Sequence, residues 1–157
     1  MNKLVPPAIV LALFLADRLS KAWALSSLKA LYGRSIEVLP VFSLTYAENT
    51  GVAFGMFQDS NLFFLVFSTA LVGVLLYMRR RIEKHGWLAA AGLALVLGGA
   101  LGNLYDRIAY GYVVDFFDFS FFPAVFNVAD SGITVGAVML ALGVKDEKKP
   151  VAGGEKT

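Results

Sequence analysis

The stretch from Gly102 to Ile133 lies between two strongly apolar runs and yet contains ionisable side chains. They are Asp106, Arg107, Asp115, Asp118 and Asp130. Charged residues at the margin of a membrane span are costly, so they are usually paired, exposed to a wet cavity or used in chemistry. Two carboxylates in an apolar site cannot both ionise easily, and a pair that shares one proton can activate water without a metal. Asp115 and Asp130 are therefore candidates for a hydrolytic pair.

Few other catalytic arrangements fit the residue types. The chain has no cysteine, which excludes disulfides and thiolate nucleophiles, and its single histidine, His85, lies in a basic loop. Ser20 and Lys21 are the residue types of a Ser-Lys dyad. Adjacent residues on a helix diverge by about 100°, however, so these two cannot share a face.

Metal binding and transport are alternative interpretations of the same carboxylates. Asp106, Asp115 and Asp130 could form a metal site, which would favour Mg²⁺ or Ca²⁺ because no histidine is near. Carboxylates in the outer leaflet also serve proton or cation transport, although four spans without an inverted repeat argue mildly against a transporter. Salt bridges within a helix bundle are the structural alternative.

Composition predicts an integral membrane protein, because 57% of the 157 residues are hydrophobic. We expect one all-α membrane domain over residues 1–148, with four transmembrane helices, and a disordered tail over 149–157. The four spans are expected at about residues 4–25, 62–78, 86–105 and 127–144. A cleaved signal peptide is the alternative for the first run, but charges precede its candidate cleavage site and further apolar runs follow.

Two segments between the spans are predicted to lie outside the membrane. Residues 29–59 contain β-branched and aromatic residues in partial alternation, which predicts a small extramembrane sheet of two or three strands between the first two helices. Residues 109–126 are aromatic and acidic, which suits the interface, where rings lie at headgroup level. Small residues late in the third span predict close helix packing. They are Gly98, Gly99 and Gly102.

Basic residues determine the expected orientation. Lys3, the cluster Arg79–Lys84 and the lysines after the fourth span lie on one side, so both termini are expected in the cytoplasm. The late residues of the first and third helices then share the outer end with the early residues of the fourth. These residues are Asp17, Lys21, Asn103, Asp106, Arg107, Asn127 and Asp130. Asp115 follows the third helix closely enough to fold back over this end.

Four sequence blocks resemble the lipoprotein signal peptidases, also called signal peptidase II. They are DRLSK at 17–21, ENTGVAFG at 48–55, GNLYDRIAYGYVVDF at 102–116 and FNVADSGI at 126–133. The family usually has threonine where Ser20 stands, and serine keeps the hydroxyl group. The resemblance covers essentially the whole membrane-embedded length of the chain.

The resemblance implies a membrane-embedded aspartic endopeptidase of the bacterial cytoplasmic (inner) membrane. Such an enzyme removes signal peptides from prolipoproteins by cleaving before the diacylglyceryl-modified cysteine. Asp115 and Asp130 match the catalytic pair. Residues with implied substrate-binding or supporting roles are Asn49, Asn103, Arg107, Asn127, Asp17 and Lys21. We expect contact with membrane lipids, no cofactor or metal, no nucleic acid partner, and a monomeric chain.

Overall fold

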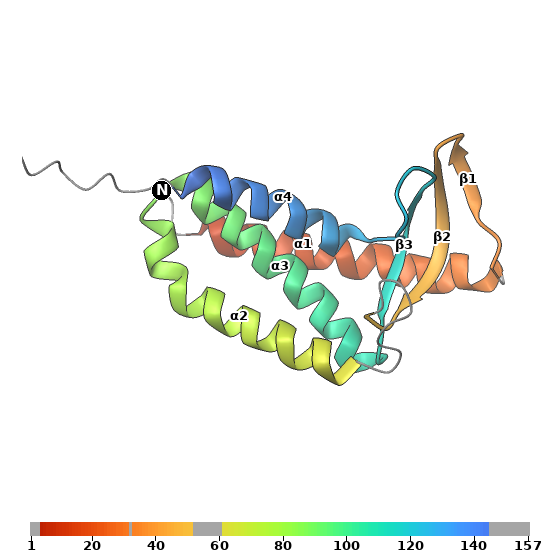
Figure 1. Ribbon diagram of the computed structural model, residues 1–157, viewed down its shortest axis with the longest axis horizontal. Helices are drawn as coiled ribbons and strands as arrows, with labels where there is room; N and C mark the ends of the chain where they lie inside the picture. The colour runs from red at the N-terminus through yellow and green to blue at the C-terminus, as the bar shows by residue number, and fades with distance from the viewer. Residues whose placement is uncertain (1–3, 32, 52–60, 145–157) are drawn as a thin grey trace, which may run out of the picture.

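The computed structural model describes residues 4–31, 33–51 and 61–144. Within these residues, four α-helices lie side by side and a three-stranded sheet crosses one end of them (Figure 1). The prediction of a mostly helical chain with a small sheet is confirmed. Lys3, the end of the ENTGVAFG block and the expected tail at 149–157 lie outside the described residues.

Helix α1 covers Val5–Trp23 and begins with two prolines, whose missing N–H groups cost no hydrogen bond in a first turn. Beyond it the winding changes to a π-helix at Ala24–Leu28 and then to a 3₁₀ turn at Lys29–Leu31. This extension carries the chain past the other helices and along the sheet (Figure 1). Residues 29–31, which were expected in the extramembrane sheet segment, therefore continue the first helix.

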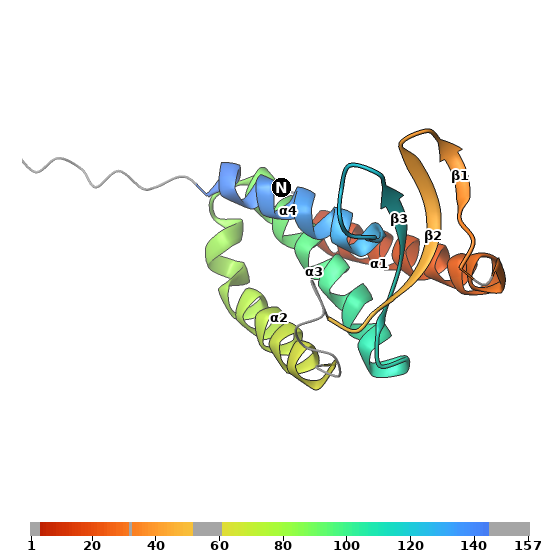
Figure 2. The ribbon, with the colours of Figure 1, turned by 45° about the vertical axis from the view of Figure 1, so that its right-hand side comes forward.

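The sheet contains β1 (Ile36–Leu39), β2 (Phe42–Asn49) and β3 (Val113–Phe119), antiparallel and in that order (Figure 2). The first two strands come from the segment in which strands were predicted. The third comes from the connection between the third and fourth helices, so the prediction that the sheet lies only between the first two helices is wrong. The segment 113–119 is completed as a strand by pairing with β2, a partner that is distant in sequence.

Helix α2 covers Asn61–Glu83 and α3 covers Trp87–Ala109, with Gly86 at φ 113° in the turn between them. The α2 helix continues through Arg79–Arg81, which were expected in a loop after a span ending at residue 78. Arginine is a good helix former, and Arg79 Nε lies 2.7 Å from Glu83 Oε1 one turn later. The basic cluster therefore ends a helix instead of beginning a loop.

Helix α4 covers Val128–Gly143 and packs closely along α3. A Cβ atom on Gly92 would lie 2.7 Å from the carbonyl oxygen of Gly136, and one on Gly99 would meet the carbonyl oxygen of Ala129. A Cβ on Gly98 would lie 3.0 Å from a carbonyl oxygen of α1. The close helix packing predicted from Gly98, Gly99 and Gly102 is confirmed, and Gly92 adds a further close contact.

Two helices, α2 and α3, are long and apolar enough to cross a membrane. Helix α4 is apolar but has 16 residues, and α1 carries three charged residues near its end. Only 6% of the apolar window of α2 is buried in the protein, compared with 67% for α3. An exposed apolar surface of this kind is typical of a helix that faces an apolar medium.

Candidate active site

Asp115 lies in the middle of β3, where it pairs with Ala47 of β2. The residue is 1% exposed, and its carboxylate accepts two hydrogen bonds from side-chain amides. Asn49 Nδ2 donates to Asp115 Oδ2 at 2.9 Å, and Asn127 Nδ2 donates to Oδ1 at 2.6 Å. The backbone N–H of Gly51 in turn donates to Asn49 Oδ1, which fixes the orientation of that amide.

Asp130 lies in the first turn of α4 and is part of a capping box. Its backbone N–H donates to Asn127 Oδ1 at 2.9 Å, and its Oδ2 accepts from the backbone N–H of Asn127 at 3.3 Å. Asn103 Nδ2 of α3 donates to Asp130 Oδ1 at 2.7 Å. Both oxygens of this carboxylate are therefore oriented by the ends of two helices.

Asn127 joins the two aspartates. It is fully buried, its amide nitrogen contacts Asp115, and its amide oxygen and backbone nitrogen contact Asp130. The structure thus brings together Asn49, Asn103, Asn127 and the two candidate catalytic aspartates around one point at the end of the bundle. The capping role of Asn127 was not predicted, although Asn followed three residues later by Asp before an apolar run is a recognisable cap signal.

Burial and charge together favour the protonated form of Asp115. Burial raises the pKa of its carboxyl to about 7, and the nearby negative charge of Asp130 adds to that rise. The hydrogen bonds from Asn49 and Asn127 act in the opposite direction, because they stabilise the carboxylate. At neutral pH this site can therefore hold one proton beside an ionised carboxylate.

Four charged side chains form a cluster next to the aspartates; Asp17, Lys21 and Asp106 are buried, and Arg18 is partly exposed. Lys21 Nζ is 3.0 Å from both Asp17 Oδ1 and Asp106 Oδ2, and Arg18 Nη2 is 2.7 Å from Asp106 Oδ1. Asp17 and Lys21 lie one helical turn apart in α1 and form one of these ion pairs. Arg18 is the member that the sequence analysis missed. Its position next to Asp17 in the apolar first helix was the available signal.

The cluster is connected to the site at three points. Lys21 Nζ donates to Asn103 Oδ1 at 2.8 Å, which directs the Asn103 amide nitrogen toward Asp130. Asp17 Oδ1 accepts from the backbone N–H of Ala129, one residue before Asp130. Asp106 Oδ2 accepts from the backbone N–H of Val114, one residue before Asp115. Asp17, Lys21 and Asp106 therefore position both aspartates without contacting either one.

Arg107 ends α3 beside the site. Its Nη1 lies 3.5 Å from the carbonyl oxygen of Asn103, and its guanidinium lies 5.6 Å from the ring centre of Phe64. The nearby carboxylates of Asp17 and Asp106 are paired with Arg18 and Lys21 and not with Arg107. In the described part of the chain, Arg107 forms no ion pair.

The other sequence candidates are placed elsewhere or engaged differently. Ser20 Oγ donates to the carbonyl oxygen of Asp17, while Lys21 faces the charge cluster, so the two do not form a dyad. His85 lies in the turn before α3, at the opposite end of that helix from Asn103. Among the described residues, no group of three His, Cys, Asp or Glu side chains could hold a metal ion.

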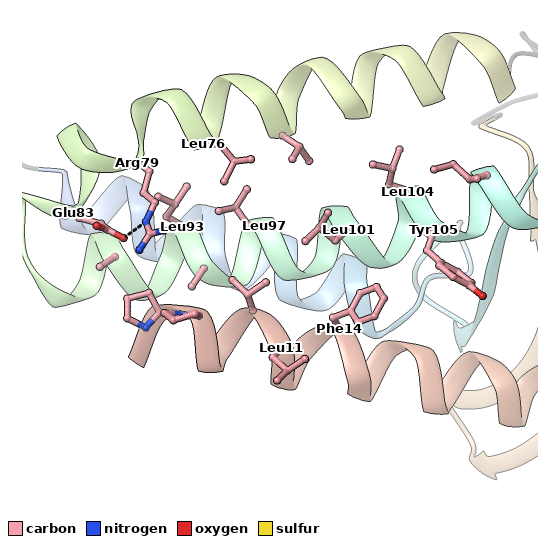
Figure 3. A pocket seen from close by; sticks show the side chains of 17 residues that line it. Leu11, Phe14, Leu76, Arg79, Glu83, Leu93, Leu97, Leu101, Leu104 and Tyr105 are labelled. Carbon is pink, nitrogen blue, oxygen red and sulfur yellow. Dashed lines mark hydrogen bonds and ion pairs between the residues drawn. The ribbon is translucent and has the colours of Figure 1, made fainter. Parts of the chain in front are cut away.

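An apolar cavity of about 620 Å³ lies between α1, α2 and α3. Figure 3 shows leucines of α3, among them Leu93, Leu97 and Leu101, and Phe14 of α1 facing this space, with the Arg79–Glu83 pair at one end. Neither aspartate lines it. The polar site and the apolar cavity are therefore separate features of the bundle.

Comparison with known proteins identifies the family. The sequence model of the signal peptidase (SPase) II family matches residues 9–144 of this chain. The chain is 46% identical over 154 residues to the lipoprotein signal peptidase of Shewanella pealeana, and 44% identical over 151 residues to that of Pseudomonas aeruginosa strain PAO1. Each alignment covers 90% of this chain and 88% of the relative.

Solved structures agree with this assignment. One bacterial membrane enzyme, determined by the in meso method at 1.9 Å, superposes with a TM-score of 0.83 and 26% identity over 93% of this chain and 96% of that one. A second, at 2.3 Å, gives a TM-score of 0.78 and 27% identity over 90% of this chain and 87% of the other. The protein therefore belongs to the signal peptidase II family, the lipoprotein signal peptidases of bacterial membranes.

Proposed function

We propose that this peptidase is of the aspartic type and that Asp115 and Asp130 are its catalytic pair. The observation that supports this proposal is that Asn127 contacts both carboxylates at once. Membership of a peptidase family sets aside the alternative of an ion or proton transporter.

The chemistry follows from one proton shared by the pair. The ionised carboxylate accepts a proton from a water molecule, and the oxygen of that water attacks the scissile carbonyl carbon. The protonated carboxyl donates its proton to the carbonyl oxygen, which gives a neutral tetrahedral intermediate. The C–N bond then breaks as the leaving nitrogen takes up the proton of one carboxyl group, while a hydroxyl group of the intermediate gives its proton to the other carboxylate and the carbonyl re-forms. The raised pKa of Asp115 supports such sharing at neutral pH.

Arg107 and Asn49 are proposed to hold the substrate and the catalytic pair in position. Arg107 has no ionic partner in the described segments, and a guanidinium is suited to carbonyl or lipid-phosphate oxygens. Asn49 ends β2 beside Asp115 and is oriented by Gly51. Both residues can therefore contact a peptide that enters between the sheet and the bundle.

We propose that the substrates are diacylglyceryl-modified prolipoproteins, cleaved before the modified cysteine at the outer face of the cytoplasmic (inner) membrane. The topology proposed with this has four transmembrane helices in a single domain over 1–148, both termini in the cytoplasm, and a monomeric chain in contact with membrane lipids. It is supported by the bare apolar surface of α2 and by the position of every site residue at one end of the bundle. A lipid-anchored scissile bond near the headgroups would lie at that level.

The test is replacement of either aspartate by asparagine, which has nearly the same size but cannot exchange the proton. Asp115→Asn and Asp130→Asn should each lower cleavage of a diacylglyceryl-modified prolipoprotein by at least about 10³-fold. Asp118→Asn is the matched control, because Asp118 lies on the same strand and bonds to Thr45 instead of to the site. Its activity should stay near that of the unaltered protein.

Two results would reject the proposal. The first is substantial cleavage by Asp130→Asn protein, with unfolding temperature and chromatographic behaviour used to establish that each variant is folded. The second is loss of activity on treatment with a chelator, followed by recovery with Mg²⁺, which would indicate a carboxylate metal site instead.

A further inference from the structure

Two turns at the edge of the sheet expose four large apolar side chains. Leu39 and Val41 flank the β1–β2 turn and are 58% and 49% exposed, while Phe121 and Phe122 follow β3 and are 75% and 49% exposed. We call these four residues the two-turn patch. None carries a charge, and aromatic and aliphatic side chains gathered in this way mark an interaction surface.

The two turns are joined to each other, so the patch is preorganised. The backbone N–H of Ser120 donates to the carbonyl oxygen of Val41 at 3.1 Å. The rings of Phe42 and Phe119 stack with their centres 4.7 Å apart, and Phe119 contacts Phe121 at 5.4 Å. The two turns, which are distant in sequence, therefore present one continuous apolar surface.

The depth of the patch is fixed by its connection to α4. The ring of Phe122 contacts the ring of Phe126 at 5.9 Å, and Phe126 directly precedes Asn127, the N-cap of α4. Figures 1 and 2 both show the two turns at the same edge of the molecule, beside the end at which α4 begins. Because α4 is an apolar helix packed along α3, its first residue lies where the chain enters the membrane in the proposed topology.

We infer that the two-turn patch inserts into the outer leaflet at the boundary between headgroups and acyl chains. Aromatic rings are favoured at that depth, and the patch is a convex pair of turns and not a groove that would enclose a peptide. This insertion rests on the topology given under the proposed function. It would hold β3, and with it Asp115, at a fixed height above the lipid, which is the height at which a lipid-anchored bond must be cleaved.

The absence of cysteine makes a direct test possible, because a single introduced cysteine can be labelled uniquely. A nitroxide label is attached to Phe121→Cys or Leu39→Cys protein in vesicles of phosphatidylethanolamine and phosphatidylglycerol. The collision rates of the label with oxygen and with a water-soluble nickel complex are then compared. Val138→Cys, an exposed position of α4, is the lipid reference, and Arg34→Cys, an exposed position before β1, is the water reference.

Both patch labels should collide more with oxygen than with nickel, as at Val138, whereas the Arg34 label should show the opposite order. A patch label that behaves like the Arg34 label overturns the inference. Protection of the patch labels from both reagents also overturns it, because that result indicates a protein partner or a second copy. This test is separate from the test of the proposed chemistry. If Asp115→Asn is inactive as expected but the patch labels are exposed to water, the aspartic mechanism stands and only the membrane insertion is refuted.

Discussion

The side chain of Asn127 has a donor end and an acceptor end, and the site uses both. Its nitrogen donates to Asp115, and its oxygen accepts the backbone N–H of Asp130. The same residue begins α4, so the step that starts the helix also sets the separation of the two carboxylates. A capping residue is in this way part of the proposed chemistry.

The pKa of Asp115 predicts the alkaline limit of activity. The Asp115 carboxyl is fully protonated well below pH 7 and loses its proton as the pH rises through about 7. We therefore expect kcat/KM to fall with an apparent pKa near 7. Replacing Asn49 by leucine removes a hydrogen bond that lowers this pKa, and should move the limit upward by ~0.5–1 pH unit while leaving residual turnover.

The same shift has a consequence for stability. The pKa of Asp115 is higher in the folded state than in the unfolded chain, so its contribution to folding is complete below about pH 4 and is lost as the pH rises toward 7.

Thr45→Val is the control for the effect of Asn49→Leu on the pH limit of activity, because Thr45 contacts Asp118. A pH limit that is the same in Asn49→Leu as in the control would contradict the role given to this hydrogen bond.

Lys21 balances two buried carboxylates, and its removal should be costly. Lys21→Met leaves Asp17 and Asp106 with Arg18 alone, and should lower the free energy of unfolding by about 3–5 kcal/mol. Adding Asp106→Asn to that variant restores the charge balance, so the double variant should unfold at a higher temperature than Lys21→Met. If the two substitutions destabilise additively, charge balance is not what Lys21 supplies.

Among the described secondary structure elements, α3 and α4 make the most extensive contact, and this contact brings Asn103 to Asp130. Gly99 lies against the carbonyl oxygen of Ala129, directly beside Asp130. The sheet supplies the opposite side of the site. Its position is set by the extension of α1, where Ala24 and Leu28 form one buried apolar cluster with Val114 and Phe116 of β3. Helix packing therefore places one aspartate and sheet pairing places the other.

A methyl group at Gly99 should separate these helices. Gly99→Ala is expected to cost ~1–3 kcal/mol of stability and to reduce kcat, because α4 and its Asp130 must shift away from Asn103. Gly73→Ala in α2 is the matched control. A Cβ there meets no atom within 4 Å, and the change should be neutral or stabilise by up to about 1 kcal/mol. Equal effects at the two positions would argue against the close-packing explanation.

At the scale of the whole molecule, the polar residues gather at one end and the apolar surface lies along the sides. Among the described elements, helix α2 packs substantially only against α3, and the cavity between α1, α2 and α3 is lined mainly by apolar side chains. Such a surface is stable in lipid, where backbone groups are satisfied within helices and apolar side chains face acyl chains. The proposed topology places the polar end at the outer face of the cytoplasmic membrane.

That topology predicts opposite labelling of two introduced cysteines. Arg34→Cys, before β1, should react with a membrane-impermeant reagent added to intact cells, because the sheet is expected outside. Lys84→Cys, in the turn between α2 and α3, should react only after the membrane is opened. Both positions are exposed on the protein, so a cysteine that does not react must be shielded by the membrane and not by the fold. Labelling of both from the same side would reject the arrangement.

The sequence by itself determined the helices, the apolar class of the chain, and the residue types that could cleave a bond. These are local properties, since hydropathy and helical spacing are read within one segment. The shared end of α1, α3 and α4 was also predictable, because alternating spans fix which ends meet. Asp17, Lys21, Asn103 and Asp130 lie together there for that reason.

Only the tertiary structure decided which side chains from different segments of the chain pair. Residues 113–119 become a strand because β2 lies beside them, and no local pattern specifies that distant partner. Arg18 and Lys21, and not Arg107, pair with Asp106, because the α1–α3 contact brings them within 2.7 Å and 3.0 Å of its carboxylate. Hydrogen bonds and ion pairs depend on distances of a few ångströms between segments far apart in the chain. Those distances are set by helix packing and sheet register. Neither can be predicted from the residue types and spacing within a single segment.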